Sequence, residues 1–118
     1  MKTIITTIVL LTSTFAFAQK SDKMNLKDLH TEKKDVQTNM MFPATDGKVI
    51  SLQILKNKEL ESHVTKVPAL LVCVEGKAIY EDEKGTKVTL LSGDFVKIPA
   101  NVKHSVKAMK NANLLLIK

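Results

Sequence analysis

Cysteine is nearly absent from this chain, and tryptophan is missing altogether. The 118 residues include a single cysteine, Cys73, so no disulfide can form within the chain in any redox compartment. The stability of the fold must therefore come from packing. Cys73 lies in the apolar run ALLVCV, where a free thiol is ordinarily buried and chemically inert. We expect Cys73 to be a core residue.

Arginine, which contacts guanine and phosphate through paired hydrogen bonds, is also absent. All eighteen basic residues are lysines, they are interleaved with twelve acidic residues, and the formal net charge is +6. The chain has only four phenylalanines and one tyrosine, too few to form a stacking platform for bases. A nucleic-acid surface needs a clustered basic patch. We therefore expect a solvated surface and no nucleic-acid partner.

The first eighteen residues, MKTIITTIVLLTSTFAFA, have the pattern of a secretory signal peptide. Lys2 precedes an apolar run, and Ala16, Phe17 and Ala18 match a small-x-small cleavage site. A membrane anchor is the alternative, but threonine and serine interrupt the run, whereas a spanning helix needs about 20 mostly apolar residues. We predict cleavage after Ala18, a periplasmic or secreted location in a bacterium, and no membrane attachment of the mature chain.

The mature chain of about 100 residues is long enough for one domain with one core. Residues 19–39 are polar and charged, and we interpret them as a flexible N-terminal segment. Within this segment, Met24, Leu26 and Leu29 could form one short helical turn. Residues 40–118 are then the folded domain.

From Val49 onward the sequence has the period and the turn residues of β-strands. The run ALLVCV has the length of a fully buried strand, and Glu75 with Gly76 is predicted to close it. The runs HSVKAM and NLLLIK are predicted as separate strands at the end of the chain. About eight short strands, with turn spacings near ten residues and no convincing long helix, indicate an all-β sandwich or barrel.

The segment SGDFVKIPANVKHSV holds Gly93, Pro99 and His104 at fixed offsets. These offsets resemble the second conserved motif of the cupin family, which has the pattern Gly-x5-Pro-x-Gly-x2-His-x3-Asn. Asn101 stands at the second glycine, a mild change because asparagine tolerates a left-handed backbone better than most residues. Ala108 stands at the final asparagine.

The first cupin motif contains two histidines, a glutamate and a glycine. His63 and Gly76 match it, whereas Thr65 stands at the second histidine and Ala69 at the glutamate. The resemblance covers residues 48–118 and looks most like small single-domain cupins. It implies an all-β, cupin-type double-stranded β-helix, which is a jelly-roll barrel with its site in the interior.

In this family, a complete site binds a divalent metal, usually iron, manganese, nickel or zinc, through three histidines and one glutamate. Only two of these four ligand positions, His63 and His104, are occupied in this sequence. The resemblance therefore implies a degenerate or weak metal site, and binding of a divalent metal stays open. Non-haem iron sites typically use two histidines and a carboxylate. Cys73 would lie roughly 13 Å along its strand from the position of the family glutamate. Glu61 shares a strand face with His63 and is better placed to support a ligand than to bind the metal.

Three functions stay open, and the catalytic residues, if there are any, are unknown from the sequence. The first function is binding of a small apolar or amphipathic molecule in the barrel, with His63, His104 and Thr65 at its polar end. An anionic or carbonyl-bearing molecule would use one histidine as a hydrogen-bond donor. The expected lining residues of this cavity include Leu52, Ile54, Leu71, Cys73 and Val106.

The second function is that of a divalent-metal-dependent oxygenase or isomerase, which needs a third protein ligand near His63 and His104. The third is that of a non-catalytic interaction protein that forms a homodimer. For this third function, the apolar tail NLLLIK is expected to pair within a sheet, either that of its own chain or that of a second copy.

Overall fold

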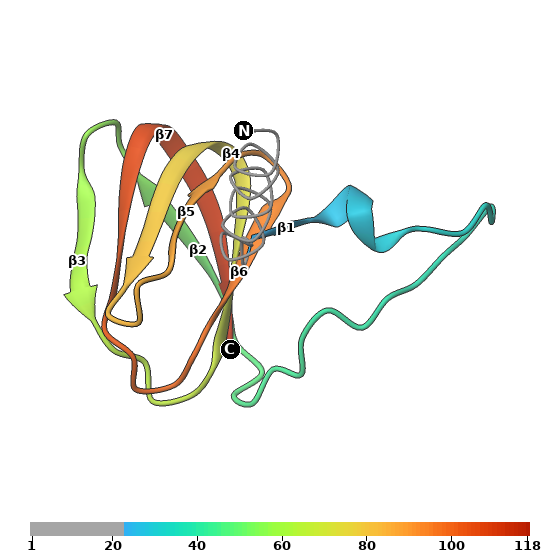
Figure 1. The fold of residues 1–118 in the computed structure, drawn as a ribbon, viewed down its shortest axis with the longest axis horizontal. Helices are drawn as coiled ribbons and strands as arrows, with labels where there is room; N and C mark the ends of the chain where they lie inside the picture. Colours follow the sequence, from blue (N-terminus) through green and yellow to red (C-terminus); the bar gives the residue numbers. More distant parts are fainter. Residues whose placement is uncertain (1–22) are drawn as a thin grey trace, which may run out of the picture.

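The computed structural model describes residues 23–118 (Figure 1). The predicted signal peptide, residues 1–18, lies outside the described residues. Within the described residues, seven strands form one sheet that folds over on itself into an all-β barrel. The elements are β1 Met24–Asn25, the 3-10 helix η1 Leu26–Leu29, β2 Val49–Ile54, β3 Glu59–His63, β4 Ala69–Asp82, β5 Lys87–Leu90, β6 Asp94–Ile98 and β7 His104–Ile117. Residues 23–118 contain no helix that is long and apolar enough to cross a membrane.

Two strands of fourteen residues, β4 and β7, form the centre of this sheet and pair antiparallel along most of their length. The first half of β4 also pairs with β6, and its second half pairs with β5. Likewise, β2 pairs with the second half of β7, and β3 pairs with its first half. Because both long strands bend, the two halves of the sheet face each other and form the two layers of the jelly roll predicted from the sequence (Figure 1).

The prediction that Glu75 and Gly76 close a strand is wrong, because β4 runs through both residues. Gly76 has φ +99°, and the register between β4 and β7 shifts on both sides of it. A Cβ atom at this position would overlap the backbone carbonyl of Asn111 on β7. Glycine therefore lets β4 bend while it stays close to β7, so the strand continues where a turn was expected.

The C-terminal runs HSVKAM and NLLLIK, predicted as separate strands, are likewise one continuous strand, β7. The prediction that NLLLIK pairs within a sheet is confirmed, and the partners are strands β2 and β4 of the same chain. β7 thus joins both layers of the barrel, as β4 does.

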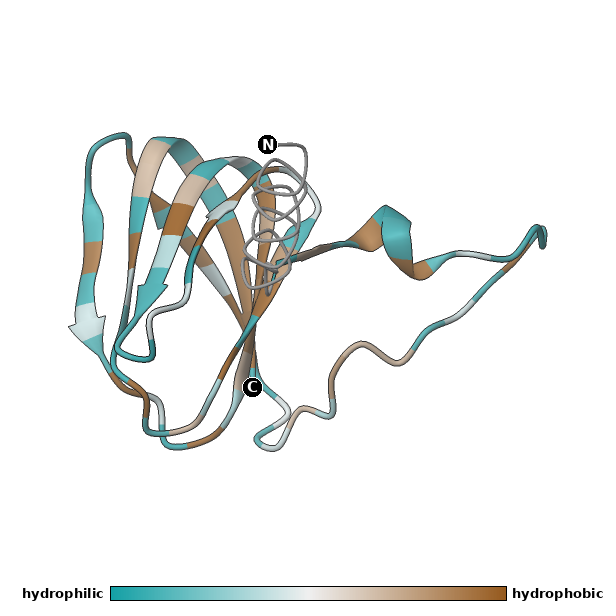
Figure 2. Cartoon of the chain, in the orientation of Figure 1, coloured by the Kyte–Doolittle hydropathy of each residue, from teal (hydrophilic) through white to brown (hydrophobic). Residues whose placement is uncertain are grey.

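The hydrophobic core fills the space between the two layers, and apolar residues alternate with polar ones along the strands (Figure 2). Four of the residues expected to line a cavity are buried members of this core, and the fifth packs against it: Ile54, Leu71, Cys73, Val106 and Leu52. The expectation that Cys73 is a buried core residue is confirmed. Burial, reinforced by the nearby charge of Asp94, raises the pKa of its thiol, which keeps the thiol unreactive.

A second, smaller cluster lies on the outer face of the β6–β4–β7 layer. Its buried members are Leu70, Val72 and Phe95. Leu29, Met41 and Phe42, which precede the barrel in the sequence, pack against this cluster. Between η1 and β2 the chain extends away from the barrel and returns to it (Figure 1).

Asp94, at the start of β6, anchors the N-terminal segment to the barrel. Its carboxylate accepts hydrogen bonds from the Asn25 side chain at 2.8 Å and from the Leu91 backbone N–H at 2.8 Å, and it lies 3.2 Å from the Lys23 ammonium. Burial opposes ionisation of this carboxyl. The hydrogen bonds and Lys23 outweigh burial, so the pKa of Asp94 lies below its ordinary value of 3.8.

Candidate functional site

The two histidines of the motif-like segments lie side by side in the structure. β3 and β7 place His63 directly opposite His104, and their ring centroids are 4.4 Å apart at an interplanar angle of 55°. His104 is only 3% exposed, whereas His63 is partly exposed. Two residues forty-one positions apart in the sequence thus form one polar pair at the end of the core.

Main-chain carbonyls hold both imidazole rings in the same way. Nδ1 of His63 donates to the carbonyl of Glu61 at 2.9 Å, and Nδ1 of His104 donates to the carbonyl of Val102 at 3.1 Å. A carbonyl oxygen can only accept a hydrogen bond, so Nδ1 carries the proton in each ring. In the neutral rings, both Nε2 atoms are consequently unprotonated and can accept a hydrogen bond.

The environment of His104 favours its neutral form. Burial disfavours the imidazolium and lowers the pKa of His104 below its ordinary value of 6.5, and the neighbouring His63 acts in the same direction. The hydrogen bond to Val102 and the charge of Asp82 oppose this effect without reversing it. At neutral pH, His104 therefore presents Nε2 as an acceptor rather than as a donor.

Tyr80 and Asp82 adjoin the pair, and the sequence analysis missed both residues. The ring of Tyr80, which is 0% exposed, stacks near His104 with centroids 5.9 Å apart, and its hydroxyl donates to Asp82 Oδ2 at 2.8 Å. Asp82 is the register partner of His104 on β4. The alternation of strand faces puts residues 80 and 82 on one face, and this pattern in AIYED was the signal that could have found them.

The second cupin-like motif forms the backbone that leads into His104. Asn101 has φ +60°, so asparagine does adopt the left-handed conformation expected where the family has glycine. Its N–H donates to the carbonyl of Thr65 at 2.8 Å, which ties the two motif segments together. Gly93 has φ +85°, and its N–H donates to the carbonyl of Cys73 at 2.7 Å.

The other candidate residues near the motif positions, Thr65, Ala69 and Glu61, have structural roles. The buried hydroxyl of Thr65 donates to the carbonyl of Val67 at 2.9 Å. Ala69 is fully buried in the hydrophobic core, opposite Ile98 on β6. Glu61 supports His63 through its main-chain carbonyl, while its side chain is exposed.

These residues do not make a complete metal centre of the family type. Within residues 23–118, no three side chains of histidine, cysteine, aspartate or glutamate are grouped so that they could hold a metal ion. The two imidazoles fit two positions of such a centre, because metal-binding histidines usually donate the other ring nitrogen to a carbonyl. Alanine and an internally bonded threonine stand at the other two positions.

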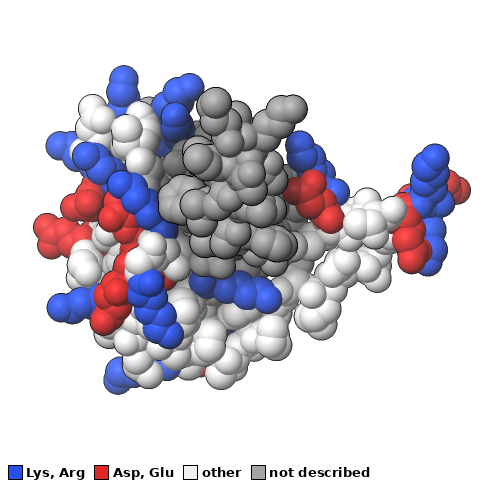
Figure 3. Space-filling model, in the orientation of Figure 1, with Lys and Arg blue, Asp and Glu red and all other residues white. Residues whose placement is uncertain are grey.

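A shallow depression of about 210 Å³ borders His104 at the surface. Three acidic side chains and one lysine are among the residues that line it: Ser62, Glu81, Asp82, Glu83, Lys103, His104 and Ser105. Figure 3 shows lysines and acidic residues interspersed over the barrel surface that faces the viewer. The approach to His104 is therefore polar, with more negative than positive groups.

No protein-family model and no curated protein matches this sequence. Several solved structures share its fold. A cupin superfamily protein from Desulfitobacterium hafniense matches with a TM-score of 0.58 and 16% identity over 80% of this chain and 87% of that chain. A cupin-like protein from Thermotoga maritima matches with a TM-score of 0.53 and 22% identity over 59% of this chain and 55% of that chain.

Oxalate decarboxylase from Bacillus subtilis, a protein with Mn(II) centres, also shares this fold. It matches with a TM-score of 0.53 and 23% identity, over 58% of this chain and 20% of that chain. The described residues therefore have a cupin fold, as the motif-like segments predicted. At these identities the likeness concerns the fold, and the chemistry of the site must be argued from the residues themselves.

Proposed function

We propose that this protein is an exported cupin-domain binding protein that holds a small hydroxyl-bearing molecule at His63 and His104. The observation that carries the proposal is the matched anchoring of the two rings, whose Nδ1 atoms both donate to main-chain carbonyls. Two neighbouring Nε2 acceptors suit the O–H groups of a ligand.

The electrostatics refine the ligand class expected from the sequence. An anionic or carbonyl-bearing ligand would need a histidine that donates a proton from Nε2. The lowered pKa of His104 disfavours that state. Separately, the acidic residues Glu81, Asp82 and Glu83 at the neighbouring depression would repel an anionic ligand. A neutral polyol or phenol therefore fits the pair better than a carboxylate does.

Thermal-shift measurements with polyols, phenols and sugars would test this proposal on chain purified without a histidine tag. A ligand at about 100 times its Kd should stabilise the fold by about 2.7 kcal/mol. The shift should disappear in His63→Gln and in His63→Ala/His104→Ala. The exposed His30, which lies in the N-terminal segment, provides the matched control His30→Ala. A shift that survives in His63→Gln, or no shift with any compound, would contradict the proposal.

A metal-dependent oxygenase or isomerase is the competing function, because two anchored imidazoles supply two metal ligands. Loading with Fe(II), Mn(II), Ni(II) or Zn(II), followed by dialysis and measurement of bound metal, separates the two proposals. The binding protein should retain far less than one metal per chain. Retention of one metal per chain, lost in His63→Ala/His104→Ala, would support the enzyme and justify an oxygen-consumption assay.

Export is the remaining part of the proposal and rests on the sequence of residues 1–18. Mass spectrometry of the protein recovered from the periplasm or the medium of a bacterial host should give a chain that begins at Gln19. A full-length chain confined to the cytoplasm would contradict export and leave the proposed binding site untouched.

A further inference from the structure

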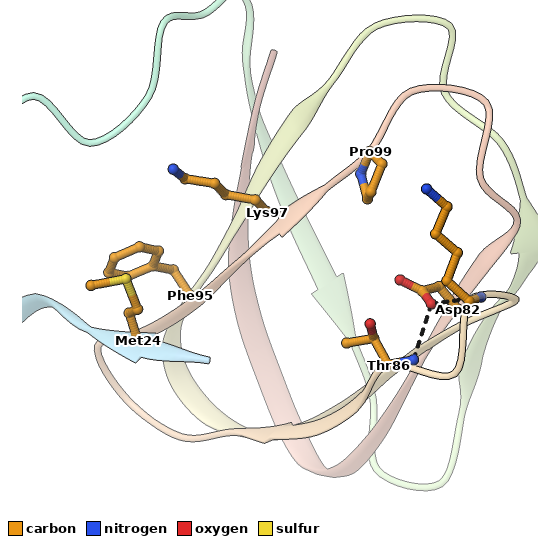
Figure 4. A pocket seen from close by; sticks show the side chains of 7 residues that line it. Met24, Asp82, Thr86, Phe95, Lys97 and Pro99 are labelled. Atoms are coloured by element: carbon orange, nitrogen blue, oxygen red, sulfur yellow. Dashed lines mark hydrogen bonds between the residues drawn. The ribbon is translucent and has the colours of Figure 1, made fainter. Parts of the chain in front are cut away.

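A second pocket lies on the outside of the barrel beside β6; its lining shares Asp82 with the depression beside His104 but includes neither His63 nor His104. Its volume is about 380 Å³, and its lining residues come from β1, β6 and the β4–β5 hairpin: Met24, Asp82, Lys84, Thr86, Phe95, Lys97 and Pro99. Figure 4 shows Met24 and Phe95 on one side of the pocket, and Asp82, Thr86 and Pro99 across from them.

The alternation of β6 explains why this pocket is outside the core. Val96 and Ile98 point into the main hydrophobic core. Phe95, Lys97 and Pro99 follow the opposite parity, which places them together on the outer face. Met24 pairs directly with Phe95 in the register of β1 and β6, and a thioether beside an aromatic ring makes a favourable apolar contact. The pocket thus has an apolar wall outside the main core, and Phe95 in this wall belongs to the smaller outer cluster.

The carboxylate of Asp82 accepts three hydrogen bonds from within the protein. Its Oδ2 accepts from the Tyr80 hydroxyl at 2.8 Å, and its Oδ1 accepts from the backbone N–H groups of Lys84 at 2.9 Å and Thr86 at 3.1 Å. These three donors occupy the carboxylate and fix the hairpin at the edge of the pocket. Asp82 keeps its negative charge, but it is one carboxylate against two lysines among the lining residues of this pocket.

The two lysines at the pocket are exposed and take part in no ion pair among residues 23–118. The three ion pairs formed there use Lys23, Lys34 and Lys87 instead. Lys84 and Lys97 therefore supply positive charge next to the apolar wall of Met24, Phe95 and Pro99. An apolar surface with two lysines and one carboxylate has an excess of positive charge, which complements a molecule that carries a negative group on an apolar body.

We propose that this outer pocket binds a small organic anion, namely a carboxylate on an aryl or short aliphatic group. The carboxylate would be attracted by the charges of Lys84 and Lys97, and the apolar group would lie against Met24 and Phe95. A volume of 380 Å³ lies near the lower end of ligand pockets, roughly 300–1,000 Å³. The size favours a short acid over a long-chain lipid. This inference is independent of the ligand proposed for the histidine pair.

Calorimetric titration with phenylacetate, phenethyl alcohol and phenethylamine tests the charge preference, because the three probes share one aromatic group. Phenylacetate should bind most tightly, and its affinity should fall as salt screens the charges. Lys84→Gln and Lys97→Gln should each weaken it roughly two- to fivefold, since exposed ion pairs contribute little individually. In Lys84→Gln/Lys97→Gln the affinity for phenylacetate should approach that for phenethyl alcohol.

Lys110→Gln is the matched control, because Lys110 is an exposed lysine on β7 that does not line this pocket. It should leave phenylacetate binding unchanged, as should His63→Gln. A heteronuclear NMR titration should place the largest shift changes at Met24, Thr86, Phe95 and Lys97. Equal affinity for the three probes, equal weakening by Lys110→Gln, or no saturation at millimolar phenylacetate would each overturn the proposal. None of these outcomes bears on the histidine pair.

Discussion

The two ends of the barrel interior use the same strands but different chemistry. Along β4 the core positions Leu71, Cys73, Ala78 and Tyr80 lead to Asp82. Along β7 the core positions continue from Leu114 through Ala112, Ala108 and Val106 to His104. Because β4 ends and β7 begins at the same place, both strands bring a polar residue to one end of the core.

The difference shows how one sheet can carry both a core and a site. At the apolar end, side chains are held by burial and contact with one another. At the polar end, hydrogen bonds hold His63, His104 and Tyr80 in place, and two of these bonds go to main-chain carbonyls. Substitutions at the first end should therefore change stability most, whereas those at the second should change binding and pH response.

The largest effect is expected at the apolar end. Leu114 is 1% exposed and lies opposite both Leu52 and Cys73. Leu114→Ala should lower the free energy of unfolding by about 2–5 kcal/mol, because a cavity forms in the core. Urea denaturation measures this loss, with Leu91→Ala, at a residue that is 49% exposed, as the control. Equal effects of the two substitutions would contradict the core assignment.

At the polar end, Tyr80→Phe keeps the ring beside His104 and removes the hydroxyl that donates to Asp82. We expect a loss of about 1–2 kcal/mol, because two backbone N–H groups still satisfy the carboxylate. A double-mutant cycle with Asp82→Asn isolates the pairwise energy. Additive losses would show that the hydroxyl and the carboxylate do not interact.

The pH dependence of stability should report on His104. The pKa of His104 in the folded state lies below 6.5, its ordinary value in the unfolded chain. At pH values between the folded and the unfolded pKa, the unfolded chain therefore binds a proton that the folded chain does not. Stability from this group is therefore complete above pH 6.5 and falls as the pH is lowered through this window, by at most about 1.4 kcal/mol per pH unit.

Chemical denaturation at several pH values measures this slope in the parent chain and in His104→Gln. The slope should shrink in His104→Gln and persist in His30→Ala. The carboxyl of Asp94 acts in the same direction, but only at lower pH, because its folded pKa lies below 3.8. A parent slope that is unchanged in His104→Gln would assign the effect to another group.

The smallest effect is expected at Asn101, where φ is +60°. Asn101→Gly should change the unfolding free energy by no more than about 0.5 kcal/mol, whereas Asn101→Ala should lower it by about 1 kcal/mol, because alanine tolerates the left-handed conformation less well. Thermal unfolding of both variants checks this order. Equal stability of the alanine and glycine variants would remove backbone conformation as the reason for asparagine here.

Much of the fold could be predicted from local sequence patterns. Short alternating and apolar runs indicated strands, and the spacing of Gly93, Pro99 and His104 indicated the barrel family. The left-handed backbone of Asn101 was expected because asparagine stands where the family motif has glycine. The error at Gly76 has a physical cause: a positive-φ glycine serves equally in a turn and in a bent strand. Its role was decided by the β7 backbone that passes beside it.

The candidate sites, like the fold, could be predicted from the sequence only in part. Sequence patterns were enough to single out His63 and His104 as the notable polar residues of two motif-like segments, and to predict that Cys73 is buried. The folded chain was needed to reveal that main-chain carbonyls fix both imidazoles and that Tyr80 and Asp82 adjoin them. It also decided that Met24 and Lys97 share an outer pocket. Strand periodicity fixes which face a residue occupies, but the long-range register of β1, β3, β4, β6 and β7 decides which residues meet.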